Sequence, residues 1–364
     1  MSSAIQWFHL GKPFPMKRGG ELPDVRLAYE TWGKLNADNS NAVMVFTGLS
    51  PGAHAASSEH DPADGWWEPM IGPGKPIDTN RFFVVCANSL GSCMGSTGPS
   101  SENPATGKAW RTEFPELSIE DIAASGHALL QHLGIKRLKA VVGPSMGGMT
   151  ALSFLNQFPG QAEHMLSISG CGAAEPYAIA VRSLQREAIC SDRLWKDGNY
   201  TDEKWPQTGM RMARKLGMMT YRSAFEWKNR FGRERQDRYP QQTWGMYFQI
   251  ESYLQAASDR FIGAFDPASY IYLSRAMDWF DVTDGSADLD EALKNSGLQT
   301  ACVIGVETDV LFPVRQQAAI ADALSRLGAM VDFYAMPSHE GHDAFLVDYD
   351  RFLPVVADYF NKLD

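Results

Sequence analysis

The sequence predicts an α/β fold with a mainly parallel sheet. Short runs of β-branched and other apolar residues, each followed by turn residues, have the length and composition of strands buried on both faces of such a sheet. Helical patterns lie between several of these runs, and this alternation is typical of a parallel sheet covered by helices. The predicted strands are 42–46, 82–87, 138–142, 165–169, 301–306 and 330–336.

Two helices with clear boundaries support this prediction. Residues 118–134 begin with Ser118 and Asp121, as a capped helix does, and end at a glycine. Residues 315–328 form a second amphipathic pattern that also ends in glycine. Each pattern is adjacent to a predicted strand, as the α/β alternation requires.

The alternation stops between residues 172 and 295. Five of the ten tryptophans lie in this stretch, together with helix-like segments at 180–190, 210–216 and 247–261. An insertion of this length between two strands of a sheet is typical of a helical lid. We therefore expect an α/β core made of 1–171 and 296–364, with 172–295 inserted as a helical lid domain.

The charge of the chain is unevenly distributed. The 364 residues carry a net charge of −10, which argues against a general nucleic-acid-binding protein because such proteins need a surplus of lysine and arginine. Between Gly172 and Gly245, however, 14 basic residues face 9 acidic ones. A basic segment in an acidic protein can attract an anionic ligand. It can equally be a solvated helical surface or a subunit interface, and charge alone leaves these readings open.

Cysteine content and hydropathy predict a cytoplasmic protein. The five cysteines are scattered without a CxxC pair, which favours neither a disulfide framework nor a zinc site. No apolar run approaches the roughly 20 residues that span a bilayer, and the N-terminus lacks a secretory pattern. We expect no metal, no redox cofactor, no membrane partner and no nucleic acid.

The sequence GPSMG at 143–147 predicts a nucleophilic serine at Ser145. It matches G-x-S-x-G, and its context is specific, because a predicted strand leads into it and a helical pattern follows. A tight strand-to-helix turn of this kind holds the serine in a strained conformation with its Oγ exposed. This combination indicates an α/β-hydrolase fold and a covalent acyl intermediate on Ser145.

Chain order then selects the other members of a catalytic triad. In α/β hydrolases the nucleophile is followed by an acid and then by a histidine. Asp309 follows the strand 301–306, and His342 follows the last predicted strand, so both are expected at the same edge of the sheet as Ser145. Glu307 is the alternative acid and His339 the alternative base; Gly341 favours His342 because it lets the loop turn this side chain inward.

An acyl-transfer site also needs donors for the oxyanion of its tetrahedral intermediate. Two backbone N–H groups usually provide them. One is expected from Met146, the residue after the nucleophile, and the other from Leu49 in the loop after the strand 42–46.

With these residues in place, the chain resembles the homoserine/serine O-acyltransferase family over nearly its whole length. The resemblance is carried by long blocks, which are GWWEPMIGPGKPIDTNRFFVVCANSLGSCMGSTGPSSENPATGKAW, VVGPSMGGM, ESYLQ followed by RFIGAFDPASYIYLSRAMDWFD, TDVLFP and SHEGHDAF. It implies acyl transfer from an acyl-CoA co-substrate to an amino-acid hydroxyl in two steps through Ser145. By position it also implies that Arg214 binds the carboxylate of the amino acid and that Asp343 binds its amino group.

The resemblance extends to the choice of substrates. The helix around Arg182 and Arg186 resembles members that use succinyl-CoA, in which an arginine pairs with the distal carboxylate; Arg182 is the first candidate and Arg186 the second. The loop formed by Ser50, Pro51, Gly52 and Ala53 departs from the usual homoserine-specific form. Together these segments resemble members that succinylate L-serine for cysteine biosynthesis. Homoserine O-succinyl- or O-acetyltransfer is the alternative within the family, and a serine esterase or thioesterase is the alternative reaction class. A homodimer is expected.

Overall fold

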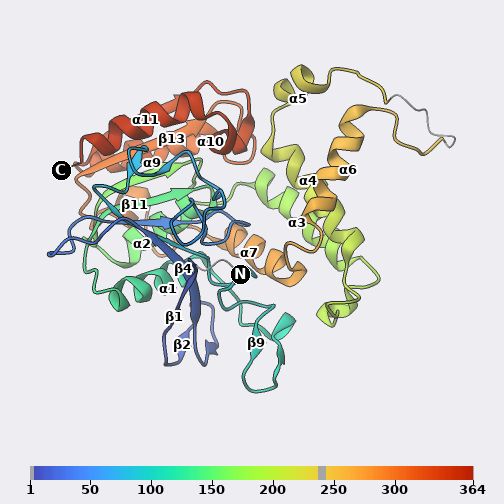
Figure 1. Ribbon diagram of the computed structural model, residues 1–364, viewed down its shortest axis with the longest axis horizontal. Coiled ribbons are helices and arrows are strands. Elements are labelled where there is room, and N and C mark those ends of the chain that lie inside the picture. The colour runs from blue at the N-terminus through green and yellow to red at the C-terminus, as the bar shows by residue number, and fades with distance from the viewer. Residues whose placement is uncertain (1–3, 237–242, 364) are drawn as a thin grey trace.

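In the computed structural model, which describes residues 4–236 and 243–363, eight strands form one sheet in the order β1-β4-β8-β5-β11-β12-β13-β14 (Figure 1). β4 pairs antiparallel with both of its neighbours, and every other pair is parallel. The strands are β1 (Gln6–His9), β4 (Arg26–Trp32), β5 (Ala42–Phe46), β8 (Phe83–Ala87), β11 (Leu138–Pro144), β12 (Ala162–Ile168), β13 (Thr300–Val306) and β14 (Met330–Met336). The predicted α/β fold with a mainly parallel sheet is therefore confirmed.

The central strands read as continuous apolar runs because both faces of the sheet are covered. In β5, Met44 and Phe46 belong to one hydrophobic core, whereas Val43 and Val45 belong to the other. The first core includes side chains of helices α1 (Ile119–His132), α2 (Met146–Gln157) and α9 (Val314–Arg326), and the second includes those of α11 (Tyr349–Asn361). Side chains of alternate residues therefore enter opposite layers, as the period of a strand requires.

The helices that cover the sheet have local sequence signals at their ends. α1 begins at the predicted position, where Ser118 and Asp121 form a capping box. The covering helices are α1 (Ile119–His132), α2 (Met146–Gln157), α9 (Val314–Arg326), α10 (Ala344–Val347) and α11 (Tyr349–Asn361). Two-stranded pairs lie in the connecting loops, namely β2 (Phe14–Pro15) with β3 (Glu21–Leu22), β6 (Ile71–Gly72) with β7 (Ile77–Asp78), and β9 (Glu102–Asn103) with β10 (Lys108–Ala109).

Between β12 and β13 the chain forms helices instead of further strands of the main sheet. These are α3 (Pro176–Cys190), α4 (Gln207–Tyr221), α5 (Ala224–Phe231), α6 (Gln249–Phe261), α7 (Pro267–Trp279) and α8 (Leu289–Leu293). Figure 1 shows α3, α4, α5 and α6 grouped at one side of the sheet. α3 begins four residues earlier than predicted, because Pro176 is favourable in the first turn of a helix. The role of this segment as a lid, and its domain boundaries, stay predictions.

Within residues 4–236 and 243–363, each helix is too short or too polar to cross a membrane.

Candidate active site

Ser145 occupies the strained turn that the sequence predicts. It follows β11, precedes α2 and has φ 55° and ψ −123°, a left-handed conformation that residues other than glycine rarely adopt. Backbone hydrogen bonds hold the turn, because the Ser145 N–H donates to the Ile168 carbonyl at 2.8 Å and the Gly148 N–H donates to the Ser145 carbonyl at 2.9 Å. The neighbouring strand and the first turn of α2 therefore fix the serine.

Glycine at position 147 is required by the close approach of two backbone segments. A Cβ atom at Gly147 would lie 2.1 Å from the carbonyl oxygen of Phe46 at the end of β5. We expect Gly147→Ala to lower the free energy of unfolding by more than about 2 kcal/mol, as overpacking does in a tightly packed interior, measured by urea denaturation. Gly52→Ala is the control: like Gly147 it has no positive φ, but the nearest atom to its Cβ position is Met94 Cβ at 3.5 Å, an ordinary van der Waals contact. Equal losses in the two variants would contradict this account.

A chain of hydrogen bonds joins Ser145 to His342 and Asp309. The Ser145 Oγ lies 2.8 Å from His342 Nε2, and His342 Nδ1 lies 2.7 Å from Asp309 Oδ2. The other oxygen of Asp309 accepts the N–H groups of Leu311 and Phe312 at 2.8 and 2.9 Å, which fixes the carboxylate. His342 and Asp309 are buried, with 3% and 4% of their surface exposed. This geometry allows His342 to remove the serine proton while Asp309 orients the ring.

The three residues meet because they follow strands of one sheet. Ser145 follows β11, Asp309 follows β13, and His342 lies in the short 3₁₀ helix Gly341–Asp343 after β14. β11 and β13 flank β12, and β14 is the edge strand beyond β13. All of these strands are parallel, so their carboxyl ends lie at one edge of the sheet.

The charge of His342 is governed by opposing effects. Burial disfavours the imidazolium, but the charge and hydrogen bond of Asp309, together with the nearby charge of Asp343, outweigh burial and raise the pKa of His342 above its ordinary value of 6.5. His342 is therefore a stronger base than a solvated histidine, and it must lose its proton before it can accept one from Ser145.

We accordingly expect kcat/KM to fall as the pH is lowered, and the midpoint of this acid limb should lie above pH 6.5. Asp309→Asn removes the charge that raises the pKa of His342, so the acid limb should move to lower pH while the rate falls by about ten-thousandfold. The pH dependence of the single-turnover rate is measured for the unmodified enzyme and for Asp309→Asn. An acid limb at or below pH 6.5 in the unmodified enzyme would contradict the assignment of His342 as the base.

The alternative base, His339, and the alternative acid, Glu307, lie outside the hydrogen-bonded chain that begins at Ser145. His339 is exposed, and its ring lies 4.1 Å from that of Phe225. Glu307 is exposed as well, at the end of β13. The hydrogen-bonded chain from the nucleophile therefore runs through His342 and Asp309.

The two expected oxyanion donors lie beside the nucleophile. Met146 is the first residue of α2, so its N–H is at the positive end of the helix. Leu49 lines the same cavity as Ser145, in the loop that follows β5. The preceding residue also places this loop near the serine, because a Cβ at Gly48 would lie 4.0 Å from the Ser145 Cβ.

The predicted acceptor loop Ser50–Ala53 continues directly from Leu49. The Asn88 side chain donates to the Pro51 carbonyl and the Trp66 indole donates to the Gly52 carbonyl, each at 3.2 Å. The loop is anchored at its end by His54, whose Nδ1 lies 2.9 Å from the buried carboxylate of Glu30. These contacts hold the loop against the core, close to the oxyanion donor.

Arg182 reaches the cavity that contains Ser145. This cavity of about 30 Å³ is lined by Leu49, Ser145, Arg182, Tyr221, Tyr270 and Phe312, among others. Arg182 is 4% exposed, and its Nε donates to Asp278 at 2.5 Å. Its Nη1 and Nη2 atoms are buried and have no hydrogen-bond partner in the described part of the chain. Two buried donors beside the nucleophile favour a ligand with a negatively charged end.

Arg186 lies one turn further along α3 and pairs with the same carboxylate. Its Nη1 is 2.7 Å from Asp278 and 3.2 Å from the Ser274 hydroxyl. The structure thus places Arg182 at the cavity, and it places Arg186 in the ion pair behind it.

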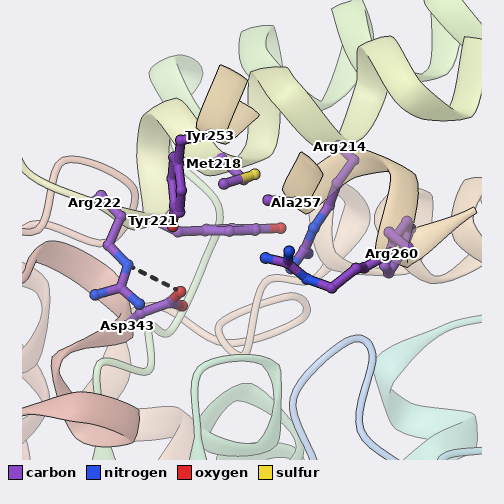
Figure 2. Close-up of a pocket in the computed structure, with 9 residues that line it drawn as sticks. Arg214, Met218, Tyr221, Arg222, Tyr253, Ala257, Arg260 and Asp343 are labelled. Carbon is purple, nitrogen blue, oxygen red and sulfur yellow. Dashed lines mark ion pairs between the residues drawn. The ribbon is translucent and has the colours of Figure 1, made fainter. Parts of the chain in front are cut away.

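Arg214 and Asp343 line a second, larger pocket of about 260 Å³ (Figure 2). Tyr221 lines both this pocket and the cavity at Ser145. Asp343 directly follows His342, and Arg222 Nε lies 3.7 Å from its carboxylate. Burial raises the pKa of Asp343, although the charges of His342, Arg222 and Arg214 oppose this shift. The pocket offers cationic and anionic groups beside the base, as an amino-acid zwitterion requires.

Comparison with known proteins supports this chemistry. Residues 43–349 match the family model described as alpha/beta hydrolase fold. A relative from Stenotrophomonas maltophilia (strain K279a) that is named serine O-succinyltransferase is 55% identical over 360 residues, which are 98% of this chain and 97% of the relative. The crystal structure of a homoserine O-acetyltransferase from Bacillus anthracis is 30% identical, with a TM-score of 0.91 over 99% of this chain and 98% of that one.

The chain belongs to the homoserine/serine O-acyltransferase family of α/β hydrolases. The protein is thus an O-acyltransferase, and the predicted α/β-hydrolase fold is confirmed. A hydrolase has the same fold. The crystal structure of esterase E22 is 27% identical to this chain, with a TM-score of 0.88 over 98% of this chain and 99% of that one. The fold of this O-acyltransferase therefore does not by itself decide which acceptor it uses.

Sequence reasoning missed several residues that shape the site of this O-acyltransferase. Asp278 joins Arg182 to Arg186, and Arg260 lines the larger pocket together with Arg214. Asp278 and Arg260 both lie in the block 260–281 that carries the family resemblance. Charged residues inside a block that is otherwise largely apolar were the available signal.

Proposed function

We propose that this O-acyltransferase transfers a succinyl group from succinyl-CoA to the hydroxyl of L-serine through an acyl-Ser145 intermediate. The observation that carries the proposal is the position of Arg182, whose two unpartnered guanidinium nitrogens share a cavity with Ser145. A succinyl group differs from an acetyl group by a distal carboxylate, and a buried carboxylate needs such a partner. The name of the Stenotrophomonas maltophilia relative supports both the succinyl group and the serine acceptor.

In the first half-reaction Ser145 is acylated. His342 Nε2 takes the hydroxyl proton as the Ser145 Oγ attacks the thioester carbonyl carbon. The carbonyl oxygen becomes an oxyanion that the N–H groups of Met146 and Leu49 stabilise. The C–S bond then breaks, the sulfur leaves with the proton from His342, and the succinyl ester remains on Ser145.

In the second half-reaction serine replaces CoA. Arg214 binds the carboxylate of the amino acid and Asp343 its ammonium group, which brings the hydroxyl to His342. His342 accepts the hydroxyl proton, the serine oxygen attacks the ester carbonyl, and the Ser145 Oγ leaves and regains a proton. The product is an activated serine whose succinate can be displaced by a sulfur nucleophile, and we therefore propose that the reaction serves cysteine biosynthesis.

Hydrolysis is the competing outcome, since the E22 esterase has the same fold. Transfer requires that the acyl-enzyme survive until the amino acid binds, and water must therefore be limited around the ester. The small volume of the cavity at Ser145 and the burial of His342 favour transfer.

The proposal is tested by offering purified protein acetyl-CoA or succinyl-CoA, each with L-serine or L-homoserine. Release of CoA and formation of the O-acyl amino acid are followed together. We expect the highest kcat/KM for succinyl-CoA with L-serine. Preferred transfer to homoserine would contradict the acceptor, preferred use of acetyl-CoA would contradict the donor, and CoA release without an O-acyl product would indicate a thioesterase.

A further inference from the structure

The pocket shown in Figure 2 contains more arginine side chains than are needed if Arg214 alone binds the carboxylate of the amino acid. Arg214, Arg222 and Arg260 line it, against the single carboxylate of Asp343. Arg222 is accounted for, because its Nη1 donates to Glu340 at 3.0 Å and its Nε lies 3.7 Å from Asp343. Arg214 and Arg260 remain, and they come from two different helices.

The contact between α4 and α6 brings these two side chains together. Arg214 lies in the middle of α4, and Arg260 lies in the last turn of α6. Figure 2 shows both side chains extending into the pocket, with their guanidinium ends converging across from Asp343. The two arginines are 46 positions apart in the chain, and the packing of the inserted helices brings them to one pocket.

Neither guanidinium forms an ion pair with an acidic side chain within residues 4–236 and 243–363, although the charge of Arg214 acts on Asp343 across the pocket. Arg214 lies over the ring of Phe261 at 4.6 Å, and its Nε is buried without a hydrogen-bond partner. Arg260 is exposed at the pocket, and no ion pair or hydrogen bond engages its side chain in this part of the protein. Two like charges that converge repel each other, and an anion bound between them removes that repulsion.

We propose that Arg260 is a second carboxylate-binding residue, which clamps the α-carboxylate of the acceptor amino acid together with Arg214. This inference rests on the proposed function. The carboxylate lies between the two guanidinium groups, while the ammonium group lies across the pocket at Asp343. With both charged groups fixed, the side-chain hydroxyl is the remaining polar group, and it faces the base that precedes Asp343 in the chain. Arg260 thereby selects a free amino acid over an uncharged alcohol.

The test compares Arg260→Met and Arg260→Lys with the unmodified full-length enzyme. Loss of a charge-assisted contact is expected to raise KM for L-serine by about tenfold or more in Arg260→Met, with a smaller rise in Arg260→Lys. KM for succinyl-CoA and the burst of CoA release from acylation without acceptor should stay unchanged, because Arg260 acts only after Ser145 is acylated. Arg211→Met is the matched control: Arg211 lies on α4, at the same contact between α4 and α6, but it pairs with Asp259 of α6 at 2.7 Å and does not line the pocket.

Three outcomes would overturn the inference. An unchanged KM for L-serine in Arg260→Met means that Arg214 alone holds the carboxylate. A raised KM for succinyl-CoA instead means that the clamp binds a phosphate of CoA. Equal effects in Arg260→Met and Arg211→Met, together with a lower Tm, mean that the helix pair is merely destabilised. Failure of the proposed function is distinguishable, because the unmodified enzyme would then prefer another acceptor, and the same comparison would be made with that amino acid.

Discussion

Replacing Ser145 with alanine is expected to lower kcat for succinyl transfer by about ten-thousandfold or more. The variant lacks the oxygen that carries the acyl group, so neither half-reaction can proceed through the ester. Losses of this size follow removal of the nucleophile in enzymes with a similar triad, where only the oxyanion donors and substrate binding still contribute. Steady-state release of CoA in the presence of L-serine measures the effect.

Ser169→Ala is a matched control for this variant. Like Ser145, Ser169 is a serine with positive φ, 48°, that directly follows a strand, here β12 next to β11; it is fully buried, whereas Ser145 is partly buried. Its hydroxyl has no hydrogen-bond partner in the described residues, so its loss should leave kcat within about threefold. A Ser145→Ala enzyme that kept a comparable rate would show that the acyl group passes directly from CoA to the acceptor.

The second large effect is expected from Arg182→Leu, which should lower kcat/KM for succinyl-CoA by about 100-fold or more. The distal carboxylate would then be buried without a cation, which costs several times the energy of an ordinary hydrogen bond. Acetyl-CoA has no such carboxylate, so its use should change far less. The measured quantity is the ratio of kcat/KM for the two donors, because a general loss of stability lowers both values together.

Arg186→Leu separates donor recognition from the ion pair around Asp278. Both arginines contact that carboxylate, but only Arg182 lines the cavity at Ser145. Either substitution leaves Asp278 with one cation, so the two variants should lose similar amounts of stability. We expect the donor ratio to change only in Arg182→Leu. An equal change in both variants would show that the succinyl carboxylate is recognised elsewhere.

The strands and the positions of the candidate triad could be predicted because their signals are local. A buried parallel strand shows as a continuous apolar run, and Gly143 and Gly147 mark a turn in which a Cβ atom would overlap backbone atoms. Chain order then restricts the acid and the base to the loops after β13 and β14. The choice between His339 and His342 depends on how a short loop folds, and the structure places the ring of His339 beside Phe225 instead.

The charged contacts of the inserted helices could not be predicted in the same way. Asp278 on α7 meets Arg182 on α3 across 96 residues, and Arg260 meets Arg214 only because α6 packs on α4. A helical pattern tells which face of a helix is apolar, but it does not tell which partner helix that face contacts. Arg186 illustrates the consequence, since from the sequence it is the second candidate after Arg182, whereas packing directs it to the ion pair behind the cavity.

The measurement that tests the central claim most directly is mass spectrometry of the enzyme quenched after mixing with succinyl-CoA in the absence of an amino acid. The account predicts that the protein gains the mass of one succinyl group, that peptide mapping locates it on Ser145, and that addition of L-serine removes it. A protein that turns over succinyl-CoA and L-serine without ever carrying the succinyl group, or that carries it on another residue, would contradict the account.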